Sequence, residues 1–194
     1  MTATPSARNV VLERSSNVVL ERSSRLVTLA LTAFALCASG MSPAGAAQKL
    51  PLAGMPAPAI SVPIIANGSG IFVLKQHLGH PVYINFFASW CEPCKEEVQT
   101  IQTVTAEPAL RNVVVIGIAE LDEPSAAKRF AQTHGLRYPI ALDQAGYIGA
   151  AYRLNELPLH VFIGADGIVK QYVEGGPIPA AELRTGLTEI SKTP

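Results

Sequence analysis

Cysteine is scarce in this chain, which carries only Cys37, Cys91 and Cys94 among its 194 residues. A small secreted scaffold held together by disulfides needs more bridges for its size, so that class of protein is excluded. Net charge is also absent, because lysine plus arginine and aspartate plus glutamate each number 15. A chain without a global positive field has no general attraction to nucleic acid. Hydrophobic residues make up 48% of the sequence, which is enough for a packed core.

Residues 1–46 have the pattern of an export signal. They contain four arginines and two glutamates, whereas residues 47–194 carry a net charge of −2. After Arg25 comes an uncharged apolar stretch, and Ala44-Gly45-Ala46 provides small residues of the kind found at cleavage sites. An uncleaved membrane anchor is the alternative, although small and turn-forming residues dilute the end of the stretch. Under either interpretation, we expect the rest of the chain outside the cytoplasm, in a periplasm.

The remaining chain divides into a linker and one domain. Residues 47–70 are rich in alanine, proline and glycine and end in the turn Asn67-Gly68-Ser69-Gly70, so we interpret them as a linker that leads into the domain at 71–194. Short apolar runs predict strands at 81–88, 112–119, 161–164 and 168–173, and helical spacing predicts helices at about 93–105, 122–135, 144–153 and 179–191. This order predicts an α/β fold with a parallel core, an antiparallel hairpin at one side, and flanking helices.

The motif Cys91-Glu92-Pro93-Cys94 lies between a predicted strand and a predicted helix. Cys91 would be near the helix N-terminus, where free backbone N–H groups and the helix dipole favour an anion. The thiol pKa would fall, and the thiolate could attack disulfides. Cys94 lies in the first turn and can reach back to resolve a mixed disulfide. Pro93 is tolerated because the first-turn donors are unpaired.

The cysteine pair has two other possible interpretations. Cys-x-x-Cys can be half of a zinc site, but no second such pair follows, and the four histidines are scattered without ligand spacing. We therefore expect no metal or cofactor, and we assign no chemical role to any histidine, His160 included. A purely structural cysteine pair is also conceivable, and an export compartment would oxidise it.

Glu97 is a carboxylate on the apolar stripe of the predicted helix. It follows Cys94 by three positions and precedes Ile101 by four, so it shares their face, whereas Glu96 points toward solvent. A carboxyl group partly buried beneath the cysteines would have a raised pKa and could exchange protons with Cys94. The alternative is that Glu97 lies at the edge of the stripe and reaches solvent.

Leu157-Pro158 precedes a predicted buried strand, where a trans proline is poorly tolerated. A cis bond would turn the chain sharply and present the backbone of Leu157 to an extended substrate. The residues alone leave the cis and trans forms open.

Together these motifs resemble the thioredoxin superfamily and, within it, the TlpA/ResA/CcmG (DsbE) group of extracytoplasmic reductants. The resemblance covers about residues 56–190 and is carried by Trp90-Cys91-Glu92-Pro93-Cys94-Lys95 and by the run from Tyr147 to Gly167. It implies a three-layer α/β/α sandwich with a central mixed β-sheet. It also implies a cis bond before Pro158 and an active-site glutamate at Glu97. Asn85 stands where cytoplasmic thioredoxins have an aspartate.

The resemblance implies a protein-disulfide reductase. Its substrates would be disulfide-containing proteins such as apocytochrome c, and a membrane thiol-electron transporter would return the electrons. Substrate contacts would come from Trp90, Glu92, Pro93, Leu157 and Pro158, and we expect a monomer that binds no nucleic acid. Leu159-His160 departs from the usual Thr-Thr or Glu-Thr after the proline, so substrate identity does not transfer directly.

Two rival functions remain at this point. Proteins of this fold span reduction potentials from about −270 to about −120 mV, so an oxidant or isomerase is the first rival. A copper-binding assembly factor for oxidases is the second, although related copper proteins use Cys-x-x-x-Cys and this motif has two intervening residues.

Overall fold

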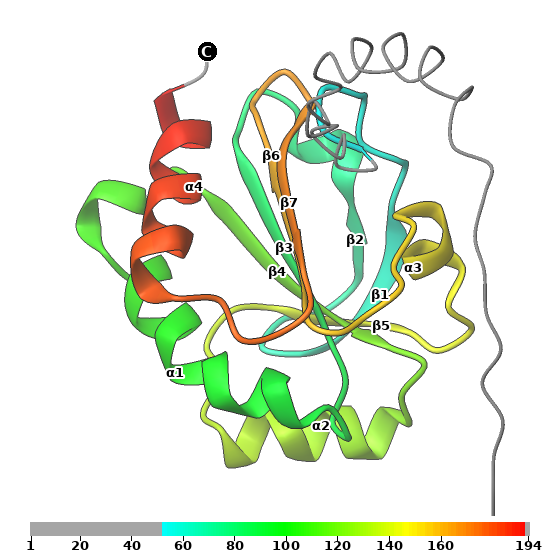
Figure 1. The fold of residues 1–194 in the computed structure, drawn as a ribbon. Helices are drawn as coiled ribbons and strands as arrows, with labels where there is room; N and C mark the ends of the chain where they lie inside the picture. The colour runs from blue at the N-terminus through cyan, green and yellow to red at the C-terminus, as the bar shows by residue number, and fades with distance from the viewer. Residues whose placement is uncertain (1–51, 193–194) are drawn as a thin grey trace, which may run out of the picture. The chain divides into compact units, whose positions relative to one another are not determined.

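The computed structural model describes residues 52–192, whose arrangement is shown in Figure 1. Among these residues a seven-stranded sheet has the order β2-β1-β5-β4-β3-β6-β7. The strands are β1 (Ser61–Ala66), β2 (Ile71–Val73), β3 (Val82–Phe87), β4 (Val114–Glu120), β5 (Ile140–Asp143), β6 (Leu159–Ile163) and β7 (Val169–Glu174). The α-helices are α1 (Glu92–Thr105), α2 (Pro124–Thr133), α3 (Tyr147–Ala151) and α4 (Ala180–Lys192).

The sheet is mixed, with a parallel centre. Strand β4 pairs in parallel with β3 on one side and with β5 on the other, whereas β6 is antiparallel to β3 and β7 is antiparallel to β6. Every residue of β3 is buried, as expected for an apolar strand that is covered on both faces. The predicted α/β sandwich, with its parallel core and antiparallel hairpin, is confirmed.

Alternate residues of the central strands face different layers. Tyr83 and Phe87 of β3 pack in one core cluster with the apolar faces of α1, α2 and α4. Ile84 and Phe86 pack in the other cluster, which includes Phe72 of β2. Because side chains alternate along a strand, Asn85 shares the face of Tyr83 and lies toward α1. This alternation brings polar residues of β3 to the helix that begins at the cysteine pair.

Three strands differ from the sequence-based prediction. The segment expected to be a linker contains β1, whose Pro63 hides the strand pattern but is tolerated because β1 lies near the sheet edge. Strand β2 follows the predicted turn and pairs with β1, which makes that turn the loop of a hairpin. Strand β5 was missed because it has only four residues. Residues 1–51, with the predicted leader, lie outside the described residues.

Helix α3 is shorter than predicted. It covers five residues instead of the expected ten, and it begins after Gly146, which has a left-handed φ of 73°. The carboxylate of Asp143 accepts hydrogen bonds from the backbone N–H groups of Tyr147, Ile148 and Gly149 and so fixes the first turn. Within residues 52–192, none of the helices combines the length and the apolar character that crossing a bilayer requires.

Candidate active site

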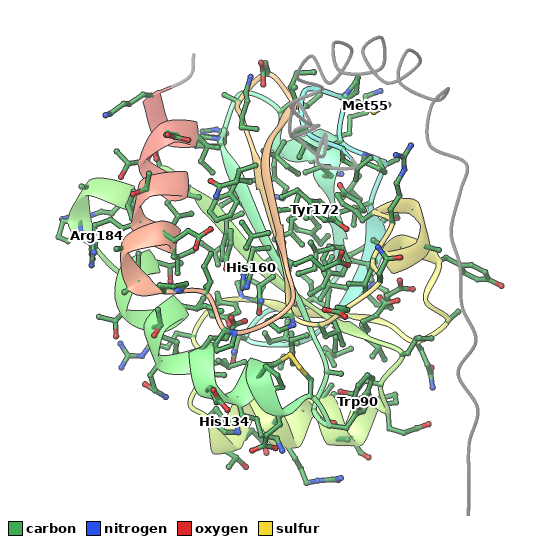
Figure 2. All side chains as sticks on the ribbon, viewed as in Figure 1. Met55, Trp90, His134, His160, Tyr172 and Arg184 are labelled. Carbon is green, nitrogen blue, oxygen red and sulfur yellow. A yellow bond between two sulfur atoms is a disulfide. The ribbon has the colours of Figure 1, made fainter. Side chains whose placement is uncertain are left out.

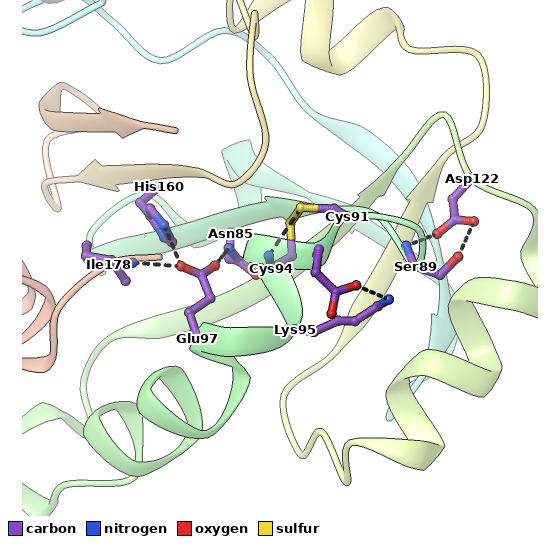
Figure 3. The surroundings of a disulfide bond; sticks show 10 residues. Asn85, Ser89, Cys91, Cys94, Lys95, Glu97, Asp122, His160 and Ile178 are labelled. Atoms are coloured by element: carbon purple, nitrogen blue, oxygen red, sulfur yellow. Dashed lines mark hydrogen bonds and ion pairs between the residues drawn. A yellow bond between two sulfur atoms is a disulfide. The ribbon is translucent and has the colours of Figure 1, made fainter. Parts of the chain in front are cut away.

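Helix α1 begins directly after the first cysteine of the motif. Cys91 is the N-cap residue, and its Sγ accepts a hydrogen bond of 3.2 Å from the backbone N–H of Cys94. The two cysteines are joined by a disulfide, with their Cα atoms 5.4 Å apart (Figure 3). The pair therefore lies at a helix N-terminus, as the sequence predicts. Unpaired N–H groups and the helix dipole at this position favour a negative charge on Cys91 after reduction.

A cleft opens beside the disulfide. Its volume is about 720 Å³, which is in the range of ligand-binding clefts. Trp90 stands at the surface next to it with 62% of its area exposed (Figure 2). The cleft combines apolar side chains with three carboxylates, and its lining residues are Trp90, Cys91, Glu92, Pro93, Glu120, Leu121, Gly146, Gly149, Ala150, Leu154, Asn155, Glu156, Leu157 and Gly176. Of the two cysteines, Cys91 thus faces a surface on which a segment of a partner protein could lie.

The peptide bond between Leu157 and Pro158 is cis, as the family resemblance implies. Leu157 lines the cleft, whereas Pro158 is buried and is not among the lining residues. The carbonyl of Pro158 accepts a hydrogen bond of 3.0 Å from the backbone N–H of Gly175, which follows β7. Of the five predicted substrate contacts, Trp90, Glu92, Pro93 and Leu157 therefore line the cleft, and Pro158 lies behind them.

The loop before the motif is anchored by Asp122, a residue whose role the sequence did not reveal. Its carboxylate accepts hydrogen bonds from the Ser89 backbone N–H (2.6 Å) and the Ser89 hydroxyl (2.8 Å). It also accepts a bond of 2.8 Å from the backbone N–H of Glu123. The sequence predicted that Asp122 would be the first residue of a helix at 122–135. The helix instead begins at Pro124 after Glu123, and Asp122 ties the end of β4 to the residue two positions before Cys91.

Glu97 is buried on the inner face of α1, as its place on the apolar stripe predicts, and only 1% of its area is exposed. Its Oε1 accepts a hydrogen bond of 3.1 Å from the Asn85 side-chain amide. Its Oε2 accepts one of 2.9 Å from the backbone N–H of Ile178, in the segment before α4. Donors from a strand and from a distant loop thus hold one carboxyl group beneath the cysteine pair (Figure 3).

His160, to which the sequence assigned no chemical role, lies next to Glu97. It lies on β6, directly opposite Asn85 of β3, and it is fully buried. Its Nε2 is 3.1 Å from Oε2 of Glu97, which is an ion-pair distance, though the alignment of a hydrogen bond is not met. Its Nδ1 is 2.8 Å from the Tyr83 hydroxyl. The predicted strand began at residue 161, so the alternation that turns His160 toward α1 could not be seen.

A second buried carboxyl group lines the cleft. Glu120 ends β4, only 4% of its area is exposed, and its Oε2 has no hydrogen-bond partner. Burial, followed by the nearby charge of Asp143, raises the pKa of Glu120 to about 8. A methyl group at Gly149 would overlap the Glu120 carboxyl group, so the glycine leaves room for it. Glu120 could not be identified from the sequence, because its neighbours Asp143 and Gly149 lie 23 and 29 residues later in the chain.

No cluster of three or more histidine, cysteine, aspartate or glutamate residues suited to a metal ion occurs among residues 52–192. Two pairs of buried titratable groups are found near the cysteines and the cleft. Glu97 faces His160 behind the cysteines, and Glu120 lies close to Asp143 at the cleft. The site is therefore equipped for sulfur and proton chemistry.

Comparison with known sequences places the domain in a family. Residues 53–172 match the model of the AhpC/TSA family. The thiol-disulfide oxidoreductase ResA of Bacillus thuringiensis subsp. konkukian is 30% identical over 102 residues, which are 53% of this chain and 59% of the relative. A protein of the same name from Oceanobacillus iheyensis is 28% identical over 97 residues, half of each chain. The chain thus spans only about three fifths or less of the curated relatives it matches.

Solved structures share the fold. A thiol:disulfide interchange protein of the thioredoxin family from Chlorobium tepidum is 25% identical, with a TM-score of 0.61 over 70% of this chain and 94% of its own. A secreted Mycobacterium tuberculosis disulfide oxidoreductase homologous to DsbE of E. coli is 24% identical. Its TM-score is 0.60, over 67% of this chain and 95% of its own. The resemblance to thioredoxin-like proteins of the ResA and DsbE type is confirmed.

Proposed function

The chain belongs to the AhpC/TSA family, and we propose that it is an extracytoplasmic thiol–disulfide oxidoreductase that reduces disulfides in partner proteins. The observation that carries this proposal is the Cys91–Cys94 pair at the N-terminus of α1, with an open cleft beside it and the carboxyl group of Glu97 behind it. Such an arrangement supplies a nucleophile, a resolving thiol and a proton carrier in one place.

In the first step, the thiolate of Cys91 attacks one sulfur of the partner disulfide. A new S–S bond forms between Cys91 and the partner, and the second partner sulfur leaves as a thiolate that takes a proton from water. The N-cap position of Cys91 favours the required thiolate, because the helix dipole and the free N–H groups stabilise its charge.

In the second step, Cys94 loses its proton and attacks Cys91. The bond between Cys91 and the partner breaks, the partner leaves reduced, and the protein keeps the disulfide seen here. Glu97 follows Cys94 by one helical turn on the buried face of α1, so we assign to it the removal of the Cys94 proton. Water is largely excluded there, which makes a built-in proton acceptor necessary.

The cleft would hold the partner during both steps. Trp90, Glu92, Pro93 and Leu157 line it beside Cys91, and they offer apolar contact together with backbone groups for an extended segment. Pro158 lies behind Leu157 and fixes its place, so we assign to Pro158 a supporting part in substrate binding.

Among possible partners we propose apocytochrome c, whose Cys-x-x-Cys-His segment must be reduced before haem is attached. A membrane thiol-electron transporter would return the electrons to Cys91 and Cys94, and the protein would work as a monomer in the periplasm. The similarity to proteins named ResA and to a secreted DsbE homologue supports this proposal, as does the export-like sequence of residues 1–46.

The proposal is tested with the full chain carrying Cys37→Ser, so that only the motif cysteines react. Reduced protein is mixed with an oxidised Cys-x-x-Cys-His peptide, and the products are separated by mass under acid quench. We expect one peptide disulfide reduced per protein molecule. With Cys94→Ser, a mixed disulfide between Cys91 and the peptide should accumulate, because the resolving thiol is absent.

The matched control is Cys91→Ser, which keeps Cys94 but removes the attacking thiol. It should trap no peptide, because Cys91 lines the cleft and Cys94 does not. Trapping through Cys94 instead would contradict the assigned roles. Failure of the parent protein to reduce any peptide disulfide would contradict the proposed function itself.

A further inference from the structure

Glu97 and His160 form a buried acid–base pair behind the resolving cysteine. The two side chains come from α1 and β6, and their facing atoms are 3.1 Å apart. Neither is reached by solvent, since their exposed fractions are 1% and 0%. A single ionised group at such a depth would be strongly destabilising unless it is paired. His160 therefore affects whether Glu97 carries its charge or a proton.

The Tyr83 hydroxyl allows this pair to gain or lose a proton without breaking a contact. When His160 is neutral with its hydrogen on Nε2, Nδ1 accepts a hydrogen bond from the tyrosine hydroxyl. When His160 is protonated, both ring nitrogens are donors, and the same hydroxyl oxygen can accept from Nδ1. Nε2 faces the carboxylate in both states. The cluster can thus store one proton without rearranging.

The other groups around the pair cannot serve this purpose near neutral pH. Burial, followed by the charge of Glu97, holds the pKa of Tyr83 well above its usual range, and the same causes raise the pKa of Tyr138. Asn85 on β3 does not titrate, and neither does Val173, which is the partner of His160 on β7. The segment before α4 contributes only the backbone N–H of Ile178. Apart from the two cysteines, Glu97 and His160 are therefore the groups here that can hold the proton.

We propose that His160 is a positioning residue that shares a proton with Glu97, so that the pair, and not the carboxylate alone, receives the proton of Cys94. This inference rests on the proposed thiol–disulfide exchange, and it deepens that function by adding the group that controls its buried proton.

In the second exchange step, the proton of Cys94 passes to the Glu97–His160 pair. Cys94 Sγ–H gives its proton to the pair and becomes a thiolate, which forms a bond to Cys91 Sγ. The bond between Cys91 and the partner breaks, and the partner sulfur leaves as a thiolate that takes a proton from water. The partner disulfide has then gained two electrons and two protons, and the cysteine pair has lost two electrons. When an external dithiol reduces the Cys91–Cys94 bond again, the pair returns its proton to Cys94.

The test follows the two steps separately in the full chain with Cys37→Ser. Reduced protein reacts with 5,5′-dithiobis(2-nitrobenzoate), which releases one coloured thiolate when Cys91 attacks and a second when Cys94 resolves the mixed disulfide. His160→Gln keeps a polar side chain but cannot titrate. The His160→Gln variant should slow the second release at pH 7 by at least about tenfold. This effect is smaller than the rate loss of about 100-fold or more that follows removal of a general base itself. The pH profile of that release should shift, and the first release should be unchanged.

Two further variants complete the experiment. His80→Gln changes an exposed histidine and should leave both releases and their pH profiles unaltered. Glu97→Gln should slow the second release, and the double variant with His160→Gln should be no slower than Glu97→Gln, because the two residues act as one unit. An unchanged second release and pH profile in His160→Gln would overturn this inference. Absence of any second release in the parent would overturn the proposed function instead.

A measurement on the parent protein covers the event that His160→Gln does not fold. The ring protonation of His160 is followed by nitrogen-15 NMR as a function of pH in the oxidised and in the reduced protein. We expect the midpoint for the buried pair to differ between the two states, because the Cys94 thiol competes for the same proton. Identical titrations in both states would overturn the inference, and His80, titrating alike in both, is the internal control.

Discussion

At the scale of single residues, the site depends on how two buried carboxyl groups are neutralised. The carboxyl group of Glu97 contacts the Asn85 amide, the Ile178 N–H and the His160 ring, so both of its oxygens have polar partners. Glu120 has a carboxyl oxygen without a partner and lies near a second carboxylate, Asp143. The first environment suits a group that exchanges protons, and the second favours a group that stays protonated up to mildly alkaline pH.

Glu120 should make the stability of the fold depend on pH. Its pKa is about 8 in the folded protein against an ordinary 4.5, so the folded state holds a proton that the unfolded state has released between these values. The contribution of the Glu120 proton to stability should therefore be fully present below about pH 4.5 and be lost as the pH rises toward 8. Glu120→Gln removes this loss. Urea unfolding from pH 5 to 9 should show the variant gaining stability relative to the parent as pH rises.

The control for this prediction is Glu96→Gln, which alters an exposed carboxyl group on α1. Its difference from the parent should stay flat over the same range of pH. A flat difference for Glu120→Gln as well would mean that Glu120 ionises normally in the folded state.

Sequence reasoning reached some of these residues and not others for a physical reason. Cys91, Cys94 and Glu97 are neighbours within two turns of one helix, so local periodicity placed them on one face. His160 and Asp122 act across distances of 63 and 33 residues, from Glu97 and Ser89 respectively. Such contacts depend on strand register, and the predicted strand began at residue 161, two residues after the start of β6, so it did not include His160.

At the scale of elements, continuous apolar runs were predictable and short or interrupted ones were not. Strand β3 is buried at every position, and its apolar sequence is a strong signal. Strand β1 is interrupted by a proline and β5 has only four residues, so neither provides a long, continuous apolar run. These two strands are stabilised mainly by their neighbours, since β5 pairs with β4 on one side and with β1 on the other.

The connection between the end of β4 and the start of α1 should depend on Asp122. Asp122→Ala removes three hydrogen bonds, two of them to Ser89, and leaves partly buried donors without this partner. Loss of such bonds costs about 1–3 kcal/mol in the free energy of unfolding. Denaturant unfolding measures that cost, and hydrogen exchange at the Ser89 amide should become faster.

Asp166→Ala provides the comparison for Asp122→Ala. Asp166 is exposed and bonds to Lys170 and to the Ile168 N–H, so its loss should cost no more than about 1 kcal/mol. An equal cost for the two variants, with unchanged exchange at Ser89, would contradict the anchoring role of Asp122.

At the scale of the whole molecule, the arrangement of layers explains how one end of the sheet becomes a reactive site. The helices α1, α2 and α4 share one core cluster with alternate residues of β3 and β6 (Figure 1). That packing encloses Glu97 and His160 and leaves Cys91 at the cleft. The order of elements predicted this architecture from the sequence, whereas strands β1, β2 and β5 and the cleft emerge only when the chain is folded.

As a reductant, the protein would donate electrons from the Cys91–Cys94 pair. The most direct test of this role is the reduction potential of the pair, measured in the full chain with Cys37→Ser by equilibration with dithiothreitol or glutathione buffers. We expect a potential near or below that of thioredoxin, about −270 mV, at which the dithiol gives its electrons readily to partner disulfides. A potential near that of DsbA, about −120 mV, would contradict this role and identify the protein as an oxidant.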